Sequence, residues 1–144
     1  MAKQQRLRVV IDTNWYVSAS INRKSRRTLY ALLADKRLQI LYADRLFEEF
    51  SEVIYRPKFE KTITSDQIQR FIRLIVPILE HIKLKTPFLV SRDPKDNYLL
   101  SLSSDGNAHY LVTGDPDLLV IDRFGETEII TMAVFQQILV DIES

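Results

Sequence analysis

The sequence predicts a three-layer α/β/α fold, in which helices cover both faces of a mostly parallel central sheet. Short apolar runs rich in β-branched residues alternate along the chain with segments whose apolar residues recur at helical spacing. The chain has 144 residues, of which 46% are hydrophobic and 27% are charged, a composition typical of a globular protein. Because no repeat or linker interrupts it, we expect residues 1–144 to form a single domain.

The boundaries of the predicted elements follow from local signals as well as from periodicity. We expect Asp12-Thr13-Asn14 to form a turn after the first strand, and Asp44, Ser65 and Asp93 to cap helices. Pro94 suits the first position of the helix that Asp93 starts. Pro57 should end the helix before it, and Pro77 should disturb the last turn of another. In chain order we expect strands at Leu7–Ile11, Leu38–Tyr42, Ile82–Leu84, His109–Thr113 and Glu128–Ile130, and helices at Arg27–Asp35, Asp44–Tyr55, Ser65–Leu79, Asp93–Ser104 and Ala133–Asp141.

Composition excludes several classes of protein. The chain has no cysteine, so disulfides and thiolate metal sites are excluded. The apolar run before Asp12 is too short for a signal peptide, and no run approaches the roughly 20 apolar residues of a membrane span. We therefore expect a cytoplasmic protein with no membrane partner.

The net charge of +1 hides an uneven distribution along the chain. Residues 1–85 carry 17 Lys and Arg against 9 Asp and Glu, whereas residues 86–144 carry 3 against 10. A basic half can bind a polyanion, and an acidic half can supply metal ligands. Uneven surface charge without a function is the simpler interpretation of this feature taken alone.

Four acidic residues are predicted to meet at one edge of the sheet. Asp12 ends the first strand and Asp115 follows the fourth, and ligands bind beyond the C-terminal ends of parallel strands. Asp96 lies in the first turn of one predicted helix, and Glu49 lies inside another that can face the same crevice. Because grouped carboxylates repel one another, we expect a hard divalent cation, Mg²⁺ or Mn²⁺, to lie among them.

Each acidic residue also has a purely structural interpretation. Asp12 and Asp93 can cap helices, Asp96 can favour a helix dipole, and Asp115 can build a turn. The glutamates of the 44–55 helix can form a solvated face. The common placement of the acids at the sheet edge favours a shared function, because independent caps need not converge.

Four motifs occur in order over nearly the whole chain: VVIDTN at 9–14, EFSEVI at 49–54 followed by RPKF at 56–59, DPKDN at 93–97, and LVTGDPDLL at 111–119. Together with IIT at 129–131 and Phe135, they resemble the motifs of PIN domains, in the branch that holds toxins of the VapC type. A single motif of this kind would be weak, whereas four in order are a specific signal.

This resemblance implies a metal-dependent endoribonuclease that serves as the toxin of a type II toxin–antitoxin pair. It also implies a homodimer and an antitoxin protein as partner. The site residues of the family map onto this sequence in three groups, namely the catalytic metal ligands Asp12, Glu49, Asp96 and Asp115, the further ligand Asp117, and the supporting residues Thr13, Asn14, Asp93 and Thr113.

The implied reaction is hydrolysis of an RNA phosphodiester by one or two metal ions, with no protein nucleophile. RNA binding requires positive charge to offset the phosphates. The best candidate is the basic run at 23–27, interpreted as a loop, and a solvated surface loop is the alternative. Its cationic residues are Arg23, Lys24, Arg26 and Arg27.

Other residues have an open interpretation. Trp15 is either a core residue or a base-stacking residue, and a core position is favoured. His81 and His109 are expected to be structural or surface residues. The 65–79 helix carries an apolar stripe that either packs in the core or is partly exposed and covered by a partner. The stripe consists of Ile68, Phe71, Ile72, Ile75, Val76 and Leu79.

Three rival classes fit the sequence less well. A phosphatase of the haloacid dehalogenase type needs a second Asp two residues after its first, where this chain has Asn14. A response-regulator receiver needs a phosphoacceptor Asp on a central strand with a nearby Lys, and the sequence offers no such pair. A catalytically inert PIN-like module that binds RNA or a protein partner is the alternative function, although all four acids are present.

Overall fold

The computed structural model describes residues 5–86 and 97–142 of the chain. Within these residues, six strands form one sheet in the order β3-β2-β1-β4-β6-β5. Neighbouring strands are parallel except for the edge pair β5 and β6, so the prediction of a mostly parallel sheet is confirmed. The strands are β1 (Leu7–Ile11), β2 (Leu38–Tyr42), β3 (Glu80–His81), β4 (Tyr110–Val112), β5 (Arg123–Phe124) and β6 (Thr127–Ile130).

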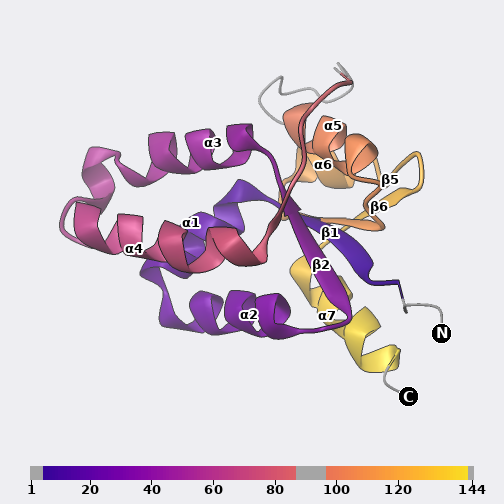
Figure 1. Cartoon of the computed structure of the whole chain (residues 1–144), viewed down its shortest axis with the longest axis horizontal. Coiled ribbons are helices and arrows are strands. Elements are labelled where there is room, and N and C mark those ends of the chain that lie inside the picture. Colours follow the sequence, from indigo (N-terminus) through magenta and orange to yellow (C-terminus); the bar gives the residue numbers. More distant parts are fainter. Residues whose placement is uncertain (1–4, 87–96, 143–144) are drawn as a thin grey trace.

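Helices cover both faces of this sheet, which confirms the three-layer prediction. Figure 1 shows α2 and α7 on one side of the strands and α5 on the other. The helices are α1 (Thr13–Ile21), α2 (Arg23–Ala34), α3 (Asp44–Ile54), α4 (Ser65–Ile75), α5 (Asn97–Asp105), α6 (Pro116–Leu119) and α7 (Met132–Asp141). Two 3₁₀ turns, Pro57–Phe59 and Val76–Ile78, follow α3 and α4, and the second contains the predicted disturbance at Pro77.

The central strand β1 determines where the two halves of the chain meet. It pairs with β2 on one side and with β4 on the other, with Ile11 in register with Val112. Val9, Val10 and Ile11 are fully buried, as expected for a strand between two helical layers. Because β1 and β4 are parallel, the residues that follow Ile11 and Val112 lie at the same edge of the sheet.

Several helix boundaries differ from the predictions. The turn expected at residues 12–14 is the start of α1, which Asp12 caps. Helix α2 begins at Arg23 behind the N-cap Asn22, so the interpretation of residues 23–27 as a loop is wrong. The N-cap of α4 is Thr64, which forms a capping box with Gln67.

Other differences concern short elements. Asp44 is the first residue of α3 and not its cap, and its carboxylate lies 2.9 Å from Nε2 of His81. The third strand ends at His81, just before the range predicted for it. The two-residue strand β5 and the single turn of α6 were not predicted. The predicted helix start at Asp93–Asp96 lies outside the described residues.

The apolar stripe of α4 packs in the core. Phe71 is 5% exposed and Ile75 is 1% exposed, and the ring of Phe71 stacks on that of Phe50 in α3, with centroids 5.8 Å apart. The interpretation of this stripe as a partly exposed docking face is therefore wrong for its central residues. Among the described residues, no helix is both long enough and apolar enough to cross a membrane.

Candidate functional site

Asp12 is the most buried acid at the carboxyl edge of the sheet. It directly follows β1, and 5% of its surface is exposed. Its Oδ1 accepts the backbone N–H of Asn14 at 3.2 Å, the bond that caps α1. Its Oδ2 accepts the hydroxyl of Thr113, which directly follows β4, at 2.6 Å. Each oxygen of Asp12 therefore has one neutral donor.

Thr113 links Asp12 to a second acid. Its buried hydroxyl oxygen accepts the backbone N–H of Asp115 at 3.0 Å while its proton goes to Asp12. Asp115 in turn caps the short helix α6, and its Oδ1 accepts the backbone N–H of Asp117 at 2.9 Å. The predicted meeting of the first and fourth motifs thus occurs through a chain of hydrogen bonds.

Glu49 brings a third acid to this edge from the middle of α3. It is half-buried, and its Oε1 accepts the hydroxyl of Tyr98 from α5 at 2.9 Å. The same tyrosine hydroxyl lies 2.5 Å from the hydroxyl of Thr13, the residue after Asp12. Tyr98 was not predicted as a site residue, although it stands two residues after Asp96 in the third motif.

The surroundings of Asp12 disfavour its ionised form. Burial raises the pKa of Asp12 above its ordinary value, and the negative charges of Glu49 and Asp115 raise it further. The hydrogen bonds from Thr113 and Asn14 lower it only in part. Burial also raises the pKa of the Tyr98 hydroxyl, and the nearby carboxylates of Glu49 and Asp12 add to this effect, so Tyr98 keeps its proton.

One cation near the site, Arg45 of α3, interacts electrostatically with Glu49. Among residues 5–86 and 97–142, no ion pair involves Asp12, Glu49 or Asp115. Within the same residues, no group of three or more acidic or histidine side chains is arranged to hold a metal ion. Asp93 and Asp96, predicted to contribute to the cluster, lie outside the described residues. The donor chemistry, carboxylate oxygens that repel one another, nevertheless fits a hard divalent cation.

The remaining residues singled out from the sequence differ in exposure and in the bonds that they form. Asn14 is exposed and reaches Asp12 through its backbone, and Trp15 is partly buried against the core, as favoured from the sequence. Arg26 is also partly buried, since its guanidinium donates to the carbonyls of Ala19 and Ser20 near the C-terminal end of α1. Arg23, Lys24 and Arg27 are exposed on α2.

The fold and the site define a parallel α/β protein whose acidic side chains gather at the carboxyl ends of β1 and β4. This chain belongs to the PIN domain family, because the family model matches residues 8–117. PIN domains are generally nucleases and typically use divalent metals. The match includes the first three motifs, the fourth as far as Asp117, and both strands that carry the site.

Two further proteins are similar to this chain. An uncharacterized protein of Methanocaldococcus jannaschii is 26% identical over 116 residues, which cover 79% of this chain and 74% of that protein. The crystal structure of VapBC2 from Rickettsia felis, bound to a DNA fragment from their promoter, contains a chain with a TM-score of 0.57 and 18% identity. That likeness covers 85% of this chain and 97% of the other, and it shows the shared fold.

Proposed function

We propose that this PIN domain is a divalent-metal-dependent endoribonuclease that acts in the cytoplasm as the toxin of a type II toxin–antitoxin pair. The observation that carries the nuclease proposal is the carboxylate cluster. Asp12 is buried and joined to Asp115 through Thr113, and Glu49 lies close enough to raise the pKa of Asp12. A cluster that holds acids together without an ion pair is suited to binding cations.

In this proposal, the metal ligands are Asp12, Glu49, Asp96 and Asp115, with Asp117 as a further ligand. When bound, Mg²⁺ or Mn²⁺ supplies Lewis-acid polarisation of the phosphodiester and lowers the pKa of a water molecule. Thr113 fixes one oxygen of Asp12, and the backbone of Asn14 fixes the other. Thr13 and Asp93 support the cluster. These donors keep the ligands in place so that little reorganisation is needed when the cation binds.

RNA contact is assigned to the exposed cations at the start of α2. Arg23, Lys24 and Arg27 lie within the first two turns of this helix and project from the surface, so they can offset phosphate charge. Arg26 was predicted to do the same, but its bonds to the carbonyls of α1 give it a structural role as well. Replacing Arg26 would therefore confuse RNA binding with the packing of α1 on α2.

A triple substitution tests this assignment. Changing Arg23, Lys24 and Arg27 to Gln should weaken RNA binding and reduce the slope of log affinity against log salt by about 2, at roughly 0.7 per lost phosphate contact. The matched control changes three exposed lysines outside α2, Lys36, Lys83 and Lys85, to Gln. A salt slope that falls equally in both variants would show that only net charge matters.

The partner proposal is an antitoxin protein, together with a homodimer of this chain. The structural relative is a VapBC2 assembly bound to promoter DNA, and the four sequence motifs resemble toxins of the same type. The central residues of the α4 stripe, Phe71 and Ile75, are buried and are not available to a dimer interface. Light scattering of the purified chain tests the dimer, and co-purification with the product of the neighbouring gene tests the antitoxin.

The central test of the proposed function is cleavage of a mixed pool of labelled RNA oligonucleotides with Mg²⁺, with Mn²⁺ and with excess EDTA. Asp12→Asn should reduce cleavage by more than about 100-fold, because even residues that only orient metal ligands contribute 10- to 100-fold. Asp122→Asn is the matched control, since Asp122 is exposed in a turn with positive φ that Asn also accepts.

Three outcomes would contradict the proposal in different ways. Full activity in EDTA would exclude the metal mechanism, and full activity of Asp12→Asn would exclude this site. Tight RNA binding by the wild type without any cleavage would instead support an inert PIN-like binding module.

A further inference from the structure

Tyr98, which has no role in the proposed reaction so far, lies where α1, α3 and α5 meet. It belongs to the first turn of α5, and its hydroxyl lies between Thr13 at the start of α1 and Glu49 in α3. The guanidinium carbon of Arg45, also in α3, lies 5.9 Å from the centre of its ring. Helix α3 therefore contacts Tyr98 twice, through the cation–π contact of Arg45 with the ring and through the bond from the hydroxyl to Glu49, and α1 contacts the hydroxyl through Thr13.

The direction of the hydrogen bonds follows from counting protons. A tyrosine hydroxyl has one proton, and an ionised carboxylate can only accept. Tyr98 must therefore donate to Oε1 of Glu49. The remaining short contact, between Tyr98 and Thr13, is then a bond in which Thr13 donates to the tyrosine oxygen. The result is a relay of donors that runs from Thr13 through Tyr98 to Glu49.

This relay restrains the side chain of Glu49. Glu49 is half-buried in the middle of a helix, and its side chain has three rotatable bonds. Tyr98 fixes one carboxylate oxygen, and Oε2 has no hydrogen bond to another described residue. Because Thr13 directly follows Asp12, the relay also ties the position of Glu49 to the strand end that carries Asp12.

We infer that Tyr98 is a positioning residue that holds the Glu49 carboxylate beside Asp12 in the orientation needed to bind a divalent cation. This inference rests on the proposed function, because it assigns Glu49 as a metal ligand. The role parallels that of Thr113 toward Asp12, although Thr113 follows strand β4 and Tyr98 belongs to helix α5. Each of these two acids then has a hydroxyl that fixes one of its oxygens.

The test measures binding of Mn²⁺ alone by titration calorimetry, without RNA, on the whole chain. Tyr98→Phe keeps the ring and its contact with Arg45 but removes the donor, so we expect Mn²⁺ binding to weaken by about 10- to 100-fold. Cleavage at low Mn²⁺ should fall by a similar factor and recover as Mn²⁺ is raised. Tyr110→Phe is the matched control, because Tyr110 lies in β4 and packs on Phe135 of α7.

Thr13 provides a second, independent variant. Thr13→Val removes the donor to Tyr98 and should weaken Mn²⁺ binding less than Tyr98→Phe, whereas Thr13→Ser should restore it. The double variant Tyr98→Phe with Thr13→Val should be no weaker than Tyr98→Phe alone, because both act through one relay. A melting temperature in EDTA distinguishes this role from a structural one, since a structural defect would lower it without changing Mn²⁺ affinity.

The possible outcomes distinguish a failure of the inference about Tyr98 from a failure of the proposed function. If Asp12→Asn abolishes Mn²⁺ binding while Tyr98→Phe binds like the wild type, the inference about Tyr98 is wrong and the proposed function stands. If the wild type binds no Mn²⁺, both are wrong. Loss of affinity in Tyr98→Phe but not in Tyr110→Phe supports the inference.

Discussion

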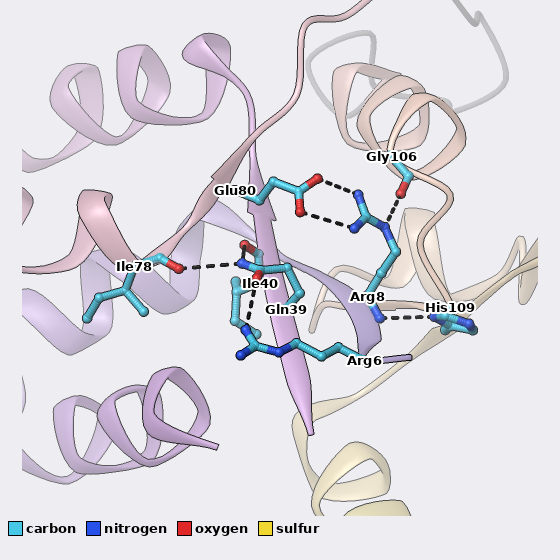
Figure 2. A network of polar contacts seen from close by, with 8 residues as sticks. All are labelled: Arg6, Arg8, Gln39, Ile40, Ile78, Glu80, Gly106 and His109. Carbon is cyan, nitrogen blue, oxygen red and sulfur yellow. Dashed lines mark hydrogen bonds and ion pairs between the residues drawn. The ribbon is translucent and has the colours of Figure 1, made fainter. Parts of the chain in front are cut away.

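The two ends of strand β1 place charged side chains in opposite surroundings. Near the start of β1, Figure 2 shows Arg8 paired with Glu80, while Arg6 donates to the neutral side chain of Gln39. Arg8 forms two bonds to Glu80, at 2.6 and 3.1 Å, and a third to the carbonyl of Gly106 at 2.7 Å. At the edge where the strands end, Asp12 and Glu49 have only neutral donors among the described residues.

Two carboxylates illustrate what this difference teaches. Arg8 holds the pKa of Glu80 below its ordinary value, whereas burial and like charges hold the pKa of Asp12 above its ordinary value. Pairing at the first edge stabilises the fold. The second edge carries an electrostatic cost in the metal-free protein, and a bound cation would remove that cost. The contrast therefore separates charges that maintain structure from charges available for function.

The largest expected effect is stabilisation by metal. At a Mn²⁺ concentration 100 times the dissociation constant, a ligand that binds only the folded state adds about 2.7 kcal/mol. For a chain of this size that corresponds to a rise in melting temperature of about 5–11 °C. Asp12→Asn should reduce the rise, and Glu80→Gln should leave it intact. If calorimetry shows the same reduced rise in melting temperature in Asp12→Asn and Glu80→Gln, the stabilisation by Mn²⁺ does not depend on the acidic site.

A second prediction concerns the pH dependence of Asp12 in EDTA. Because its pKa is raised in the folded state, Asp12 favours folding at low pH and loses that contribution as pH rises from 3.8 through the folded pKa. Relative to the wild type, Asp12→Asn should therefore gain unfolding free energy over this range, by the order of 1 kcal/mol. The pH-dependent part of the difference therefore reports the ionisation of Asp12, including the hydrogen bonds that favour its charged form. Urea titrations at several pH values measure it, and a flat difference would contradict it.

The third prediction has the opposite sign at the other edge. Glu80 has a lowered pKa, so its contribution is present above 4.5 and is lost as pH falls through the folded pKa. Glu80→Gln should lower the unfolding free energy by about 0.5–1 kcal/mol at pH 7, a value limited by the solvent exposure of the pair. The penalty should shrink below pH 4.5. A penalty that is the same at all pH values would show that the ion pair adds no stability.

The smallest expected effect concerns the buried hydroxyl of Tyr16, which takes part neither in the Arg8–Glu80 pair nor in the acidic site. Tyr16 in α1 is fully buried, and its hydroxyl has no hydrogen-bond partner within the described structure. Removing an unsatisfied buried polar group is favourable, so Tyr16→Phe should raise the unfolding free energy by about 0.5 kcal/mol. Tyr98→Phe, which breaks a satisfied pair of bonds, should not stabilise the protein. Urea unfolding of both variants checks this difference.

The sequence predicts the parts of the site that depend on strand ends. Asp12 and Asp115 could be placed together because residues after parallel strands share an edge, and the Thr113 bond confirms that they meet. Glu49 was a weaker prediction, since its helix face had to be guessed. Tyr98 could not be predicted, because its role depends on how α5 lies against α1 and α3. No local pattern encodes that packing.

The fold shows a similar division. Strands and helices with apolar periodicity were predicted to within a few residues. The start of α2 was missed because its first turn contains no apolar residue and so gives no helical periodicity. The stripe of α4 was misread in part because sequence alone does not reveal that α3 lies over it, with Phe50 stacked on Phe71. The strand β5, with two residues, is too short for any periodic signal.

The pairing of β1 with β4 sets the order in which the protein can be completed. Asp12 and the hydroxyl that fixes it are 101 residues apart, with α1 to α5 between them. During synthesis, the edge of β1 that pairs with β4 stays unpaired until residues 110–112 have emerged. Contacts between residues so far apart in the chain form slowly. A nascent or truncated chain therefore contains the first acids but lacks the strand that joins them to Asp115. Asp12 and Asp115 can therefore meet only in a chain that already contains β4.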